Sequence, residues 1–233
     1  MIRSKFPQVI IFDLDGTLID SVPDLQGALN ELLAGEGLGY LSQKEVKMMI
    51  GDGIPNLVRR GFLAAGVNLA NGELDEAILE FSSIYSGRLT KLTTTFPGTK
   101  EMLKSLKKQG CCLAICTNKP YFAANQVLIK LNLAHFFKIL IGGDSLSGVK
   151  KPNPLPILEI LKGLRCPKQG AIMVGDSKND IEAAKNAGIK SIAVSFGYSP
   201  SPVNELGAGA TISNFEELIP SIEKMTKINI SQD

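Results

Sequence analysis

The chain has 233 residues, of which 44% are hydrophobic and 21% are charged, and its formal net charge is +2. A charge so close to zero, without a run of like charges, argues against binding to nucleic acid or to an anionic membrane. No apolar segment approaches the roughly 18 residues of a membrane span, and the run at Val9–Phe12 is too short for a signal-peptide core, so we expect a cytoplasmic protein.

Short apolar runs that alternate with segments of helical periodicity predict a doubly wound α/β fold, in which helices join parallel strands. Strands are expected at 9–14, 112–116, 139–142, 171–174 and 191–194, and the helices between them at 100–108, 122–131, 155–164 and 179–187. Ligands of such sheets bind at the carboxyl ends of the strands. The residues that follow the strands are therefore the first candidates for a site.

About seventy residues separate the first strand from the next helix and strand, which is too many for an unstructured loop. Helical patterns at 25–33, 44–50, 54–65 and 74–89, separated by glycines, predict a small helical domain inserted at this point. We expect an α/β core of residues 1–19 and 93–233, and a helical domain of residues 20–92.

The side chains available for chemistry are restricted by composition. The four cysteines lack the spacing of a zinc site and lie in or beside apolar segments, which indicates a reducing compartment. His135 is the only histidine, and its neighbours Phe136 and Phe137 favour a partly buried structural role. Any chemistry must then depend mostly on carboxylates, lysine, hydroxyls and metal.

The first strand ends in the sequence Asp-Leu-Asp-Gly-Thr, which begins at Asp13. Strand periodicity places Asp13 and Asp15 on one side of the chain, and Gly16 allows a tight turn beside them. Two carboxylates so close together are costly unless a cation or a proton separates their charges. The alternative is a turn in which the aspartates cap backbone amides.

Polar residues also follow the later strands. Thr117 and Asn118 precede a helix, where a hydroxyl, an amide side chain and backbone N–H groups can bind a phosphate group. The alternative is that Thr117 is an ordinary helix cap. Lys151 lies before Pro152, which restricts its backbone to an extended conformation; the alternative is a solvated surface lysine.

Two further acids follow the fourth strand. Asp176 lies at its tip, and Asp180, one helical turn later, either supports Asp176 or serves the helix N-terminus. The polar groups after all four strands converge on one edge of the sheet. This convergence favours a common site over independent turns and caps.

In order, the motifs DLDGT, TN, KP and GDSKND resemble those of the haloacid dehalogenase superfamily, and the inserted helical domain resembles its helical cap. The resemblance implies Mg²⁺-dependent hydrolysis of a small-molecule phosphate ester through an aspartyl-phosphate intermediate. It favours 2-phosphoglycolate as substrate, with pyrophosphate and sugar phosphates as alternatives.

The same resemblance implies roles for individual residues. Asp13 is the nucleophile, and Asp15 is the general acid and base. Mg²⁺ is bound by the Asp13 carboxylate, the Asp15 backbone carbonyl and Asp176. The phosphoryl ligands are Thr117, Asn118 and Lys151, and Asp180 orients the metal shell or Lys151.

The helical domain is expected to select the substrate. The glycines around Asp52, Gly51 and Gly53, allow a loop to approach a small ligand closely. An arginine suits a substrate carboxylate. Arg59 and Arg60 both lie off the apolar face of the helix 54–65, so periodicity does not choose between them, and resemblance favours Arg60. The alternative is two solvated arginines.

Two other functions are weighed against hydrolysis. A β-phosphoglucomutase-like enzyme has the same motifs and would release an isomeric sugar phosphate in place of inorganic phosphate. A receiver-like signalling domain also carries acids, a hydroxyl and a lysine at its strand ends, but such domains are typically shorter and have no cap. The sequence favours no particular oligomeric state.

Overall fold

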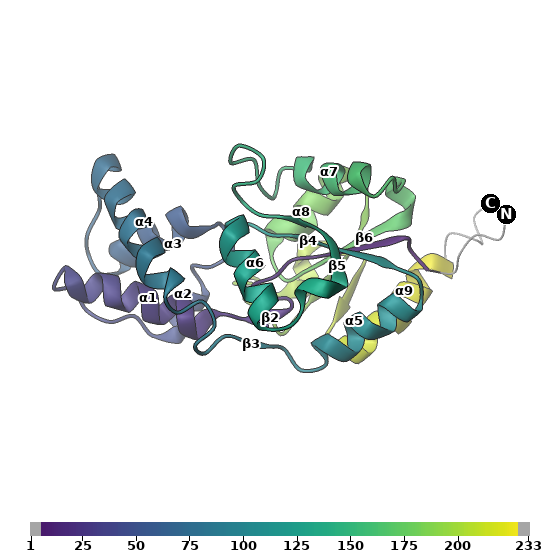
Figure 1. Ribbon diagram of the computed structural model, residues 1–233, viewed down its shortest axis with the longest axis horizontal. Helices are drawn as coiled ribbons and strands as arrows, with labels where there is room; N and C mark the ends of the chain where they lie inside the picture. Colours follow the sequence, from purple (N-terminus) through teal and green to yellow (C-terminus); the bar gives the residue numbers. More distant parts are fainter. Residues whose placement is uncertain (1–5, 228–233) are drawn as a thin grey trace.

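A six-stranded parallel sheet lies at the centre of the computed structural model, which describes residues 6–227 (Figure 1). Its strand order is β5-β4-β1-β6-β7-β8, so β1 lies between β4 and β6. This arrangement confirms the expected doubly wound α/β fold. The strands are β1 (Val9–Phe12), β4 (Cys112–Cys116), β5 (Phe137–Ile141), β6 (Ala171–Gly175), β7 (Lys190–Val194) and β8 (Ala210–Ile212).

Strand β1 is apolar throughout because both of its faces are covered. Ile10 and Phe12 pack into one hydrophobic cluster, and Val9 and Ile11 pack into another on the opposite face. Helices α5 (Thr99–Lys108), α6 (Tyr121–Lys130) and α9 (Leu218–Lys227) contribute to the first cluster, and helices α7 (Leu155–Gly163) and α8 (Lys178–Ala187) contribute to the second.

A segment of four helices is connected to the core at both of its ends by a pair of short antiparallel strands. These strands are β2 (Ile19–Asp20) and β3 (Thr94–Thr95), and Ile19 pairs with Thr95. Helix α1 (Val22–Gly35) is tied to the returning chain, because Asp24 Oδ2 accepts hydrogen bonds from the N–H groups of Leu92 and Thr93 at 2.9 and 2.7 Å. Helices α2 (Gln43–Lys47), α3 (Ile54–Ala64) and α4 (Asn71–Ser86) complete a group beside one end of the sheet (Figure 1).

Several sequence-based expectations need correction. The first strand ends at Phe12 and not at residue 14, because Asp13 begins the loop to β2. The helix expected at 44–50 ends at Lys47. His135 is exposed and not partly buried, and its ring packs against Phe136 with centroids 4.1 Å apart. The short strands β2, β3 and β8 and the helix α9 lie outside the predicted elements.

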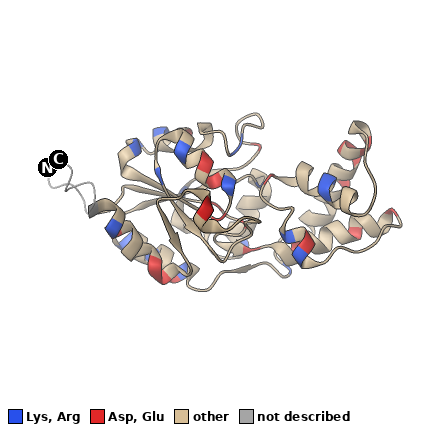
Figure 2. Cartoon of the chain, turned by 180° about the vertical axis from the view of Figure 1, so that it is seen from behind, with Lys and Arg blue, Asp and Glu red and all other residues tan. Residues whose placement is uncertain are grey.

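Basic and acidic side chains are mixed along the helices that flank the sheet (Figure 2). Within residues 6–227, no helix has both the length and the hydropathy of a membrane span. The cytoplasmic location remains a prediction.

Candidate active site

The two aspartates of the first motif lie in a tight loop directly after β1. Asp13 remains hydrogen-bonded to the sheet, since its N–H donates to the carbonyl of Val174 in β6 at 2.9 Å. Gly16 has φ +85°, and a Cβ at this position would lie 2.4 Å from Asp176 Oδ2. A glycine is required here because it alone allows the loop to approach Asp176 so closely. Thr17 completes this contact by donating to Asp176 Oδ1 at 2.8 Å.

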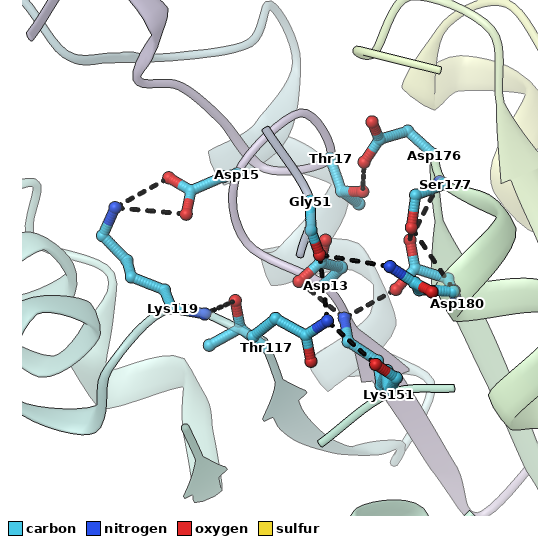
Figure 3. A network of polar contacts seen from close by, with 12 residues as sticks. Asp13, Asp15, Thr17, Gly51, Thr117, Lys119, Lys151, Asp176, Ser177 and Asp180 are labelled. Carbon is cyan, nitrogen blue, oxygen red and sulfur yellow. Dashed lines mark hydrogen bonds and ion pairs between the residues drawn. The ribbon is translucent and has the colours of Figure 1, made fainter. Parts of the chain in front are cut away.

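Three buried carboxylates converge beside this loop. Asp13, Asp176 and Asp180 each offer an oxygen, and these oxygens all lie within 4.8 Å of one another. Asp176 follows β6, and Asp180 is in the first turn of α8, where it also caps the helix through Ser177. The predicted convergence of these three acids is therefore present (Figure 3).

The cluster is unfavourable for negative charge. Burial and then the charge of Asp180 raise the pKa of Asp13 to about 7, against the lowering effect of Lys151. Burial, Asp180 and Asp13 raise the pKa of Asp176 to about 8, although hydrogen bonds from Tyr198 N–H and Thr17 oppose the shift. Carboxylates raised in this way bind either protons or a cation. An all-oxygen donor set of this kind fits Mg²⁺.

Lys151 is the buried cation of this cluster. Its ammonium lies 2.8 Å from Asp13 Oδ1 and 2.6 Å from Asp180 Oδ1. Burial alone would lower the pKa of Lys151, but the charges of Asp13 and Asp180 outweigh burial and raise it. The side chain is 2% exposed, so the alternative of a solvated surface lysine is wrong.

Thr117 and Asn118 follow β4, the other neighbour of β1. Thr117 Oγ1 accepts a hydrogen bond from the N–H of Lys119 at 3.2 Å. Asn118 Nδ2 donates to the carbonyls of Gly51 and Lys151 at 2.9 and 3.0 Å, whereas its Oδ1 is buried without a hydrogen-bond partner among the described residues. The amide donors of Asn118 therefore connect the core to the loop between α2 and α3.

The loop of Gly51, Asp52 and Gly53 lies against the core through residues that the sequence did not single out. Asn179 Nδ2 donates to Asp52 Oδ1 at 2.7 Å, and Lys150 Nζ donates to the Asp52 carbonyl at 2.7 Å. Both partners are sequence neighbours of predicted site residues, Asp180 and Lys151, and this adjacency is the signal that would have indicated them.

Arg60 in α3 contacts the same loop. Its guanidinium forms an ion pair with Asp52 and donates to the carbonyl of Met49 at 2.9 Å. Burial would raise the pKa of Asp52, but hydrogen bonds from Asn179 and Arg60 outweigh burial and lower it. Arg59 is exposed.

A cavity lies between the helical segment and the core, beside the aspartate loop. Its apolar wall includes Leu25, Ile54 and Leu57, and its polar wall includes Asp13, Asp15, Thr117 and Lys119. Lys119 is a site residue that sequence reasoning missed. Its buried ammonium lies 3.0 and 3.1 Å from the two oxygens of Asp15 (Figure 3). It also lies 2.7 Å from the hydroxyl of Tyr85 in α4.

Comparisons with known proteins find related sequences and a related structure. The sequence pattern of the haloacid dehalogenase-like hydrolase family matches residues 10–194. A phosphoglycolate phosphatase of Caulobacter vibrioides is 40% identical over 206 residues, which are 88% of this chain and 86% of that protein. One of Rhodospirillum rubrum is 39% identical and covers 91% of this chain and 89% of its own. A crystal structure described as a predicted phosphoglycolate phosphatase from Haemophilus somnus 129PT is similar with a TM-score of 0.87 at 31% identity, covering 94% of this chain and 98% of that one.

Proposed function

Because this chain belongs to the haloacid dehalogenase-like hydrolase family and is a phosphatase, we propose that it hydrolyses 2-phosphoglycolate through an aspartyl-phosphate on Asp13, with Mg²⁺ as cofactor. The observation that carries this proposal is the convergence of Asp13 and Asp176, which follow the adjacent strands β1 and β6, with Lys151 from the loop between β5 and α7. The relatives named as phosphoglycolate phosphatases support the choice of substrate.

In the proposed reaction, an oxygen of Asp13 attacks phosphorus and the bond from phosphorus to the ester oxygen breaks. Asp15 gives its proton to the leaving oxygen, and its carboxylate then takes a proton from the water that hydrolyses the aspartyl-phosphate. Ser21 and Lys119 orient Asp15, since both donate to its carboxylate. The second step restores Asp13 and releases inorganic phosphate.

The remaining charged groups stabilise the transferred phosphoryl group. Thr117, Asn118 and Lys151 are proposed to bind its oxygens, and Asp180 holds the Lys151 ammonium in place. For Asn118 this requires the release of one of its hydrogen bonds to the Gly51 and Lys151 carbonyls. The Asp13 and Asp176 carboxylates and the Asp15 backbone carbonyl would hold Mg²⁺. When bound, the ion neutralises charge on the phosphoryl oxygens and on the carboxylates around it.

Residues 20–92 are proposed to act as a cap domain on the core of residues 1–19 and 93–233; residues 1–5 and 228–233 of that core lie outside the described residues. The loop of Gly51, Asp52 and Gly53, held by Arg60, would select substrates by its position over the cavity. A cap that closes in this way excludes water from the reaction.

A screen of phosphate esters with Mg²⁺ tests the proposal. We expect steady release of inorganic phosphate, with the highest kcat/KM for 2-phosphoglycolate. Preference for pyrophosphate or a sugar phosphate would contradict the substrate assignment. Formation of an isomeric sugar phosphate would indicate a mutase, and a single turnover without further release would indicate a receiver-like domain.

Metal binding is expected to depend on pH. The raised pKa values of Asp13 and Asp176 mean that, without metal, the folded protein keeps protons that the unfolded chain loses above about pH 4. The free energy of unfolding of the metal-free protein should then fall as pH rises from about 4 to 8, and Mg²⁺, which replaces these protons, should counter the loss. We expect Mg²⁺ to raise the Tm more at about pH 8 than at about pH 5, as measured by thermal unfolding with Mg²⁺ or with chelator.

The matched control for this measurement is Asp176→Asn, which removes one proposed ligand and should abolish most of the Mg²⁺ effect. A Tm at about pH 8 that does not respond to Mg²⁺, or full activity after exhaustive chelation, would refute the metal assignment.

We also expect Ca²⁺ to inhibit turnover, because its larger coordination number favours binding by both oxygens of Asp13 and leaves neither free to attack.

Arg60→Ala is expected to lower kcat/KM by about tenfold, through loss of the ion pair that positions Asp52 and hence the loop. The loss should be similar for 2-phosphoglycolate and for an aryl phosphate whose aryl group carries no charge, because the guanidinium contacts the loop and not the substrate. Arg59→Ala, on the same helix but exposed, is the control and should leave kcat/KM unchanged. A loss confined to 2-phosphoglycolate would mean that Arg60 binds the substrate carboxylate directly.

A further inference from the structure

Two buried ammonium groups flank the aspartate pair, one at each carboxylate. Lys151 lies 2.8 Å from Asp13 Oδ1, and Lys119 lies 3.0 and 3.1 Å from the two oxygens of Asp15. Figure 3 shows that they reach the loop from different sides. Each ammonium is paired with carboxylates of the chain, and the site thus holds two separate cationic groups, which suits a substrate with two anionic groups.

Lys119 is the cation that faces the cavity. Among the described residues that line the cavity, it is the one basic side chain. Arg60 and Lys150 do not line the cavity; their contacts are with the Asp52 loop and Met49, whereas those of Lys119 are with Asp15 and Tyr85, which do line it.

We propose that the Lys119 ammonium binds the carboxylate of the substrate, so that the enzyme selects phosphate esters of short 2-hydroxy acids. The inference rests on the proposed function, in which Asp15 protonates the leaving oxygen. That oxygen must then lie within hydrogen-bond distance of Asp15, whose two oxygens both contact Lys119. In an ester of a 2-hydroxy acid, the carboxylate carbon is two bonds from the leaving oxygen, which brings the carboxylate beside the ammonium.

The surroundings of Lys119 favour this contact. The side chain is 3% exposed and its ammonium donates to Asp15 and Tyr85, so a substrate carboxylate need not displace a hydration shell but must share or replace one of these acceptors. The apolar wall of Leu25, Ile54 and Leu57 strengthens charge pairing in the cavity. Tyr85 accepts a hydrogen bond from Lys119 and fixes the side chain from the helical segment.

The test compares two esters of the same length in the Mg²⁺-loaded enzyme, 2-phosphoglycolate and ethyl phosphate, which lacks the carboxylate. Wild type is expected to prefer 2-phosphoglycolate by about 100-fold in kcat/KM, and Lys119→Met should reduce that ratio to within about tenfold of unity. Because Lys119 also contacts Asp15, some loss on both esters is expected, and the ratio isolates the carboxylate contact. Lys130→Met, an exposed lysine at the end of α6, is the control and should keep the wild-type ratio.

A second variant and a binding measurement guard against misfolding. Lys119→Gln keeps a hydrogen-bond donor towards Asp15 and Tyr85 but removes the charge, and it should lose the preference as Lys119→Met does. Calorimetric titration should show that wild type binds 3-phosphonopropionate, in which CH₂ replaces the bridging oxygen, more tightly than propylphosphonate. Either variant should bind the two phosphonates with equal affinity.

The outcomes separate this inference from the proposed function. Loss of kcat/KM by equal factors on both esters, with the ratio unchanged, would overturn carboxylate binding and leave Lys119 as a positioning residue for Asp15. Equal kcat/KM values of the wild type for ethyl phosphate and 2-phosphoglycolate would overturn the inference, while the phosphatase activity would stand. Release of phosphate from no ester would overturn the proposed function itself.

Discussion

Asp13→Asn is expected to reduce the rate of phosphate release by more than about 1,000-fold, because an amide is a poor nucleophile and a poor ligand for a hard cation. The substitution keeps the shape of the side chain, so the loop around Gly16 should retain its conformation. It also removes a carboxylate that lies within 4.8 Å of the acidic groups of Asp176 and Asp180. We therefore expect the metal-free variant to unfold at or above the wild-type temperature at about pH 8, where that repulsion is largest.

Steady-state phosphate release with 2-phosphoglycolate and Mg²⁺ measures this prediction, and thermal unfolding verifies the fold. Asp13→Ala serves as a second variant that no hydrolysis of the amide side chain can convert back to aspartate. Activity within about tenfold of wild type in both variants would rule out Asp13 as the nucleophile.

Asp15→Asn is expected to lower kcat for an alkyl phosphate by about 100- to 10,000-fold, the usual contribution of a general acid and base. An ester with a good leaving group, such as 4-nitrophenyl phosphate, needs no proton in the first step. With that ester the variant should release a burst of nitrophenolate equal to the enzyme concentration, and then turn over slowly because water is no longer activated to attack the aspartyl-phosphate.

Rapid mixing measures the burst, and mass spectrometry of the quenched protein should find one added phosphoryl group. The variant with both Asp13→Asn and Asp15→Asn is the control and should give neither. A uniform loss on both esters, without a burst, would indicate that Asp15 does not act as acid and base but supports the conformation of the loop.

The sequence predicted the parts of the site that local patterns determine. Asp13, Thr117 and Asp176 follow buried strands, and parallel strands bring their carboxyl ends to one edge whatever the details of the loops. Strands β2 and β3 have two residues each, which is too short to show an alternation of apolar and polar residues, so they could not be predicted. Helix α9 was missed despite its signal, the apolar spacing of Leu218, Ile222 and Met225.

The contacts between the helical segment and the core could not be predicted, because they join residues far apart in sequence. In the sequence, Lys119 is one of the residues directly before a predicted helix, and only the folded chain places its ammonium between Asp15 and Tyr85. Asn118 is predicted to bind phosphate, and that role stays a prediction; its hydrogen bonds to the carbonyls of Gly51 and Lys151 could not be predicted from local pattern. Periodicity placed Arg60 off the apolar face correctly, but it carried no information about the ion pair with Asp52.

Because β2 pairs with β3, the chain enters and leaves the helical segment at neighbouring positions, and the order of the core strands does not depend on that segment. Residue 20 ends β2 and residue 94 begins β3 directly opposite, so a tight turn would suffice to join them without altering the order of the central sheet. The entropy of closing an insertion grows only slowly with its length. Evolution or design is therefore free to lengthen, shorten or exchange this segment, and so to change which molecules reach the strand ends, while the residues on those ends stay in register.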